Sequence, residues 1–258
     1  MVITDTELTG LVASYVWPFI RIGAMFAMLP FLGARTIPVQ ARLLLAVGLT
    51  VAVAPLLPSP PAVDPISLTG MLISIQQVVI GIVMSFGLQM LFSIMIIAGQ
   101  VVANSMGLGF ASMVDPQNGV QVPLVGQLYL MFSTLMFLAM DGHLVMIQLL
   151  VESFALIPIG LDGISRVGLW ELVSWASYMF AAGVLVAIPI VTALLLINLS
   201  FGVITRAAPQ LNIFAVGFPI SLMVGIILIW VTLPNVLNQF EGLMNEAFMM
   251  IRLVVRGG

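Results

Sequence analysis

Few residues of this chain have side chains suited to acid–base or metal chemistry. His143 is the only histidine, and Asp141 lies two residues before it. Residues at positions i and i+2 point to different faces of a helix, and a protein-bound metal ion usually needs three or four converging ligands. The pair therefore predicts a polar break in a helix rather than a metal site or a proton-transfer site.

Three further charged residues lie in or beside long apolar segments: Arg21, Glu152 and Glu171. A charge inside a bilayer is costly, so each of them is a candidate for a functional group. All three lie close to the end of an apolar segment or to a break in one. We therefore expect interfacial snorkelling or pairing inside a helix bundle, with a transport site as the alternative.

The composition is that of an integral membrane protein, because 62% of the residues are hydrophobic and 7% are charged. The net charge of −3 leaves no basic patch for a nucleic acid, and the absence of cysteine excludes disulfides and thiolate metal sites. No nucleophile elbow, phosphate-binding loop, zinc-protease motif or dinucleotide fingerprint is found in the sequence. We expect a non-enzymatic membrane protein with no cofactor and no nucleic-acid partner.

Six main apolar segments must position these residues. They run from about Leu8 to Leu32, Leu43 to Leu57, Ser67 to Asn104, Leu124 to Ile157, Trp170 to Ile204 and Ile220 to Phe240. As one helix the third segment would be about 57 Å long, against about 30 Å for the hydrocarbon core of a bilayer. We expect it either to bend at Gly81, Gly87 or Gly99 or to be covered by protein instead of lipid. The fold class is therefore an all-α membrane protein with six main long, kinked helices arranged in hairpins.

The connection from Val102 to Pro123, "VANSMGLGFASMVDPQNGVQVP", is unusually apolar. Its glycines give the backbone freedom, and its methionines and phenylalanine give bulk without charge. The run "DPQNG" predicts a turn into the next helix. A flexible apolar segment of this kind can exclude water and ions from a pore, and the alternative is a loop buried against helices.

A second connection, "RAAPQLNIFAVGFPI", runs from Arg206 to Ile220. Pro209 and Pro219 are expected to break the backbone, and Arg206 can interact with the free carbonyls at a helix end. Side-chain amides in this stretch can bond a non-helical main chain. The pattern predicts a structural turn or a contact with a partner protein.

These two stretches, together with the length and the six apolar segments, resemble the FliR family of the flagellar type III protein-export gate. Residues 99–117 are similar to the family's stretch between its third and fourth apolar segments, and residues 206–220 to its segment before the last hairpin. Homologues in virulence-associated injectisomes share the general pattern. An injectisome subunit is therefore one alternative, and a secondary transporter with discontinuous helices is another.

The resemblance implies a non-enzymatic subunit of a right-handed helical channel made of several proteins. Its expected partners are FliP-like and FliQ-like subunits, an FlhB-like switch protein, exported unfolded flagellar proteins and membrane lipid. The expected location is the bacterial inner membrane, in the flagellar basal body, with the complex projecting to the periplasmic side. Residues 1–204 would form a FliP-like four-segment region that includes a plug loop at 105–122. Residues 205–258 would form the connection and C-terminal hairpin region, with the FliQ-like unit beginning near residue 170.

The resemblance also implies roles for individual residues of the two connections. The channel plug would consist of Met106, Gly107, Leu108, Gly109, Phe110 and Met113. The turn that follows the plug would consist of Asp115, Pro116, Gln117, Asn118 and Gly119. The candidate contacts with partner subunits are Arg206, Pro209, Gln210, Asn212, Phe214, Gly217 and Pro219.

Overall fold

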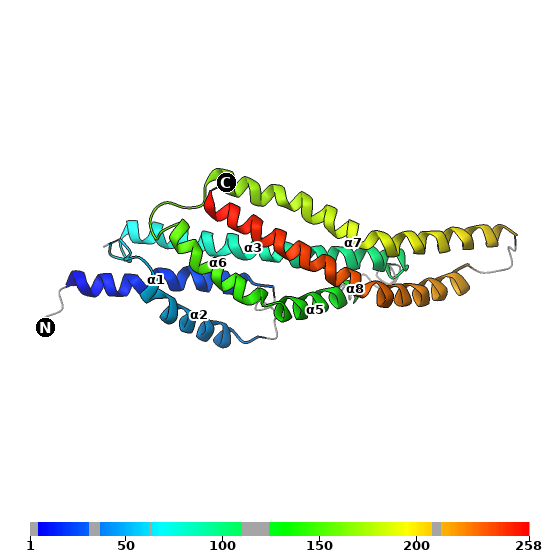
Figure 1. The fold of residues 1–258 in the computed structure, drawn as a ribbon, viewed down its shortest axis with the longest axis horizontal. Helices are drawn as coiled ribbons and strands as arrows, with labels where there is room; N and C mark the ends of the chain where they lie inside the picture. The colour runs from blue at the N-terminus through cyan, green and yellow to red at the C-terminus, as the bar shows by residue number, and fades with distance from the viewer. Residues whose placement is uncertain (1–4, 31–36, 62, 110–123, 208–212, 258) are drawn as a thin grey trace. The chain divides into compact units, whose positions relative to one another are not determined.

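The computed structural model of the chain describes residues 5–30, 37–61, 63–109, 124–207 and 213–257. These residues form helices and connections and contain no strand, as the sequence predicts (Figure 1). The helices are α1 (Asp5–Met28), α2 (Val39–Val53), α3 (Leu68–Ser105), α5 (Leu124–Ala139), α6 (Gly142–Leu156), α7 (Arg166–Ala207) and α8 (Ile213–Arg256), with a short 3-10 turn, η1 (Ala54–Leu56), after α2.

Within the described ranges, five helices are long and apolar enough to cross a membrane, or six if the broken pair α5 and α6 counts as one span. These spans correspond to the six apolar segments of the sequence. The predicted polar break near Met140–His143 is confirmed, because α5 ends at Ala139 and α6 begins at Gly142. Asp141 lies between them with a left-handed backbone, at a φ of 56°. The protein is therefore an all-helical, multi-span membrane protein.

The long third segment is a single helix, α3, and the protein itself covers much of it. Within its 18-residue apolar stretch, 67% of the residues of α3 are buried, against 22–39% for the corresponding stretches of the other four long helices. Gly81, Gly87 and Gly99 all lie inside this one helix, where each closely approaches a neighbouring helix. Of the two explanations for its excess length, cover by protein is therefore the one that the structure supports.

The chain forms two compact units. The first unit consists of Met1–Met90, Met140–Ala176 and Asn245–Gly258, and the second of Leu91–Ala139 and Ser177–Met244. In the first unit, Trp17 of α1 is fully buried and its indole N–H donates to Ser74 Oγ of α3 at 3.2 Å. A Cβ atom at Gly81 would lie 2.4 Å from the backbone oxygen of Arg21, so α1 and α3 touch through their backbones.

The second unit is built around the C-terminal part of α3. The ring of Phe92 on α3 meets Phe137 of α5 edge-on, with 5.5 Å between the ring centroids, and lies 5.9 Å from Phe240 of α8. Helix α7 approaches at Gly183, where an added Cβ would lie 2.8 Å from Ile97 Cγ2. One helix thus organises the packing of three others.

The prediction that Pro219 breaks the backbone is wrong, because α8 runs through both Pro219 and Pro234. Proline removes one hydrogen-bond donor from a helix. In an apolar segment, leaving the helix would expose many more backbone groups without partners. Continuing the helix with a locally missing hydrogen bond is therefore the less costly solution here.

Candidate functional site

The first apolar connection begins with a well-defined helix end. Gly107 has a φ of 86°, its N–H donates to the Asn104 carbonyl at 3.1 Å, and the Leu108 N–H donates to the Ala103 carbonyl at 3.0 Å. This pair of hydrogen bonds around a left-handed residue is the Schellman motif, which satisfies carbonyls that a helix end would leave free. Glycine suits the position because a side chain disfavours positive φ. Gly107 therefore fixes where α3 stops and the connection starts.

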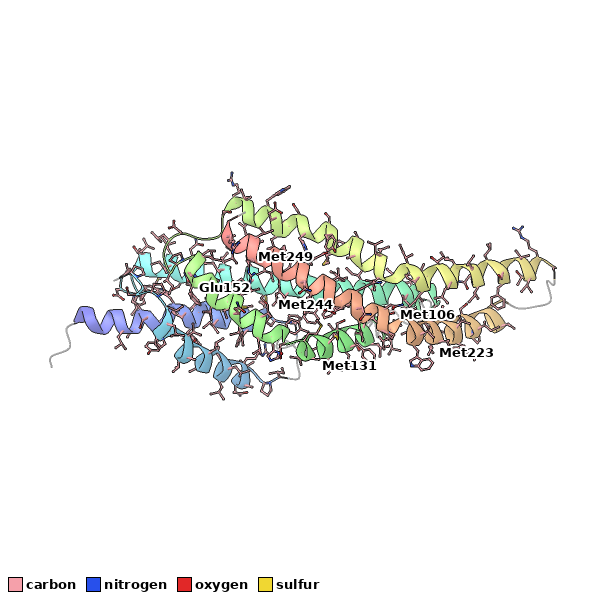
Figure 2. All side chains as sticks on the ribbon, in the orientation of Figure 1. Met106, Met131, Glu152, Met223, Met244 and Met249 are labelled. Carbon is pink, nitrogen blue, oxygen red and sulfur yellow. The ribbon has the colours of Figure 1, made fainter. Side chains whose placement is uncertain are left out.

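Met106, just before this glycine, is anchored on α8 (Figure 2). Its side chain is buried, and a Cβ atom added at Gly225 would lie 2.6 Å from Met106 Cγ and 2.9 Å from its Sδ. The absence of a side chain at Gly225 thus creates the recess that holds Met106. Met106, whose flexible apolar side chain fills an irregular space, therefore anchors the start of the connection on α8.

The other end of the connection is held by a contact between glycines. A Cβ atom at Gly99 of α3 would lie 2.4 Å from Gly126 Cα and 2.5 Å from Gly126 N of α5. Helices that approach this closely need small residues at the contact. The end of α3 and the start of α5, which lead into and out of the connection, are therefore fixed to one another inside the second unit.

The predicted plug residues fall partly within this arrangement. Leu108 and Gly109 follow Met106 and Gly107 and are half-buried. The remaining plug and turn residues lie outside the described residues: Phe110, Met113, Asp115, Pro116, Gln117, Asn118 and Gly119. The structure thus shows how the base of the predicted plug loop is held.

The second connection is also described in part. Arg206 is exposed in the last turn of α7, where a positive charge interacts favourably with the helix dipole. Gly217 is buried and Pro219 is exposed, and both lie inside α8. Phe214 belongs to the first turn of α8, and Pro209, Gln210 and Asn212 lie outside the described residues.

A buried arginine lies in the first unit. The Arg21 guanidinium donates through Nε to Gln77 Oε1 at 2.8 Å, through Nη1 to Ser153 Oγ at 3.0 Å and through Nη2 to the Ile157 carbonyl at 2.9 Å. It also lies 4.1 Å from the ring centroid of Phe154, a favourable cation–π distance. Neutral groups on α3 and α6 and in the segment that follows α6 thus solvate a charge on α1.

The expectation that Arg21 lies near an end of its apolar segment or a break in it is wrong, because Arg21 is fully buried in α1, which runs from Asp5 to Met28 through Pro18. The expectation that it pairs inside a helix bundle is confirmed by its hydrogen bonds. Sequence reasoning did not identify Gln77 or Ser153 as its partners. The sequence marks Gln77 only as a polar residue, a carboxamide, inside an apolar segment that contains no charged residue.

Of the two candidate carboxylates, Glu152 forms an ion pair and Glu171 is exposed. Glu152 of α6 accepts a hydrogen bond from Gln148 at 3.0 Å and lies 3.4 Å from Arg252 of α8, and both members of this ion pair are partly exposed. Glu171 is exposed on α7. Among the described residues, no three His, Cys, Asp or Glu side chains come together in a way that could hold a metal ion.

Comparison with known proteins identifies relatives over most of the chain. The family model described as "Bacterial export proteins, family 1" matches residues 12–247. The flagellar biosynthetic protein FliR of Escherichia coli K12 is 36% identical over 241 residues, which cover 93% of this chain and 92% of the relative. The FliR of Pectobacterium carotovorum is 37% identical over 243 residues, covering 94% and 92%. The FliR of Bacillus subtilis 168 is 29% identical over 227 residues, covering 86% and 87%.

Proposed function

Because this chain belongs to the FliR family of flagellar export proteins, we propose that it is a core subunit of the flagellar type III protein-export gate and lines part of its secretion channel. The family relationship makes it a multi-span membrane subunit of the flagellar export apparatus.

In this proposal, residues 105–122 form a plug that keeps the channel closed until export. The observation that carries it is the way in which the base of this loop is held: Met106 is seated on Gly225, and Gly99 lies against Gly126. A plug must resist being displaced by ions and small solutes, so its ends need fixed supports. Its apolar side chains would close the pore by excluding water, and methionines can rearrange around a passing chain.

The proposed partners are FliP-like and FliQ-like subunits and an FlhB-like switch protein, and the proposed substrates are unfolded flagellar proteins. The last two helices expose a large apolar surface, which is consistent with cover by partner subunits or by lipid. Only 33% of the 18-residue apolar stretch in α7 and 22% of that in α8 are buried within the chain. Arg206, Gly217 and Pro219 lie at the far ends of these helices and are proposed contacts with the partners.

We also propose an organisation and a location for the chain. Residues 1–204 would correspond to a FliP-like region, and the last two helices, from near residue 170, to a FliQ-like hairpin. The complex would reside in the bacterial inner membrane and project to the periplasmic side. A right-handed helical arrangement of subunits would cover the apolar faces that this chain leaves open.

We expect the chain to be recovered mainly in a complex with other subunits. Exposed apolar surface on this scale is typical of an interface or of a lipid-facing wall. The measurement is extraction of the native complex in mild detergent, followed by sizing and by identification of its subunits by mass spectrometry. The same chain expressed without its partners serves as the control and is expected to be degraded or aggregated. Recovery of a stable monomer that transports a small solute would instead favour a secondary transporter.

A further inference from the structure

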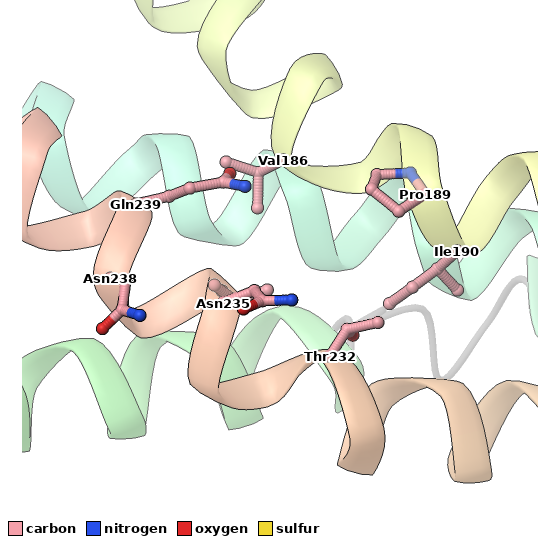
Figure 3. A pocket seen from close by; sticks show the side chains of 8 residues that line it. Val186, Pro189, Ile190, Thr232, Asn235, Asn238 and Gln239 are labelled. Atoms are coloured by element: carbon pink, nitrogen blue, oxygen red, sulfur yellow. The ribbon is translucent and has the colours of Figure 1, made fainter.

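A cavity of about 320 Å³ lies between α7 and α8 within the second unit (Figure 3). Its floor is apolar, because Val186, Ile190 and Val236 are buried. Its remaining lining residues are Pro189, Thr232, Asn235, Asn238 and Gln239. The cavity therefore combines an apolar floor with three carboxamides and a hydroxyl from α8.

The polar groups are placed together by helix periodicity. Thr232, Asn235 and Gln239 follow one another at spacings of three and four residues, which places them on one face of α8. The Thr232 hydroxyl donates to the Leu228 carbonyl at 2.8 Å, so its oxygen can still accept a hydrogen bond. Across the cavity, Pro189 lacks an N–H, so the carbonyl of Leu185 has no helical donor four residues on. Donors and acceptors are thus concentrated where the two helices face one another.

The surroundings of this cavity are apolar. Leu185 and Ile188 on α7 and Trp230 and Val231 on α8 are large exposed hydrophobic residues in the same stretches of the two helices. Carboxamides in apolar surroundings are stabilised by hydrogen bonds to another helix. An occupant of the cavity therefore has to offer a polar group while fitting against an apolar surface.

The charge of the lining restricts the chemistry of the occupant. None of the eight lining residues is charged, so a phosphate or carboxylate would enter without a counter-charge. An acyl chain would leave the carboxamides without partners. A volume of about 320 Å³ leaves room for a side chain. A neutral side chain that both donates and accepts hydrogen bonds satisfies all of these conditions.

We propose that this cavity receives a carboxamide or hydroxyl side chain from an apolar helix of another subunit of the export apparatus. Asn235 and Gln239 bond the incoming group, and the apolar residues around the cavity pack against its helix. This inference rests on the proposed function for the presence of neighbouring subunits. It adds a polar contact that fixes the position of a partner helix against the α7–α8 hairpin.

A photo-crosslinker placed at the cavity tests the identity of the occupant. The chain has no cysteine, so Asn238→Cys provides a single attachment point for benzophenone maleimide in the assembled complex. Asn245→Cys is the matched control, because Asn245 is exposed on the same helix but does not line the cavity. We expect position 238 to cross-link to an apolar partner helix next to an Asn, Gln, Ser or Thr residue. Cross-links to lipid alone, or no adduct beyond the level at position 245, would overturn the proposal.

A second pair of variants tests the contribution of the hydrogen bonds. Asn235→Leu with Gln239→Leu is expected to lower the recovery of one partner subunit about tenfold, since each interhelical hydrogen bond contributes modestly. Asn245→Leu, which replaces one carboxamide with leucine outside the cavity, is expected to leave recovery unchanged. Equal recovery from both variants would contradict the proposal. If the unmodified chain assembles but both tests are negative, the cavity inference alone fails; if it assembles with no subunit, the proposed function fails as well.

Discussion

Removing the groups that accept hydrogen bonds from Arg21 is expected to destabilise the protein more than removing the arginine itself. Gln77→Leu with Ser153→Ala leaves the guanidinium buried without its two side-chain acceptors. Breaking a buried charge network from one side typically costs about 3–5 kcal/mol. Arg21→Met removes the charge and keeps an apolar side chain of similar length, so the expected loss in the free energy of unfolding is smaller. In the Arg21→Met variant, the Ser153 hydroxyl can still donate its hydrogen bond to the Leu150 carbonyl, at 2.7 Å.

The triple variant that combines all three changes is the control for this prediction. It should recover most of the stability that the double variant loses, because no buried charge remains to be solvated. The measurement is thermal unfolding of the purified complex, compared across the single, double and triple variants as a thermodynamic cycle. A triple variant as unstable as the double variant would show that packing at Gln77 and Ser153, and not the charge on Arg21, determines the loss.

Gly99→Ala is expected to force apart the two helices that support the loop. The added Cβ would lie 2.4–2.7 Å from backbone atoms of Val125 and Gly126, and backbone atoms cannot move aside as the end of a flexible side chain can. Overpacking of this kind costs about 1–3 kcal/mol. We expect lower thermal stability of the complex and an increased leak of ions, because the ends of the proposed plug loop lose their support.

Gly242→Ala is the matched control for this change. An added Cβ at Gly242 meets no atom within 4 Å, and both substitutions gain helix propensity of about 1 kcal/mol. A loss of stability at position 99 but not at position 242 therefore reports the contact between α3 and α5. Thermal unfolding and a flagellar export assay on both variants measure it. Equal stability of the two variants would contradict the claim that the contact at Gly99 supports the loop.

Much of the architecture could be predicted from the sequence, because a bilayer permits few arrangements of the backbone. The six apolar segments and the break beside Asp141 follow from length, hydropathy and backbone chemistry, whereas cover of the third helix by protein was one of two explanations that the sequence left open. The wrong prediction at Pro219 shows where this reasoning fails. A proline is a strong helix breaker in water, but in an apolar segment the surrounding backbone has no better hydrogen-bond partner than the helix itself.

The contacts between distant residues could not be read from the sequence. Arg21 bonds Gln77 and Ser153, which are 56 and 132 residues away, and no charge pattern points to either of them. Gly99 was expected as a possible bend, but its role is a close approach to Gly126, a residue that sequence reasoning did not single out. In helices that are apolar on nearly every face, periodicity does not show which side meets which neighbour.

The most direct test of the proposed plug is the ion conductance of the assembled complex in a planar bilayer, with and without Gly107–Val114. We expect a closed channel for the unmodified complex and a conducting one for the deletion. Replacing the same eight residues with a glycine–serine segment of equal length should also conduct, because it keeps the connection but removes its apolar bulk. Unchanged, closed behaviour of both variants in an intact complex would contradict the proposal that this loop closes the channel.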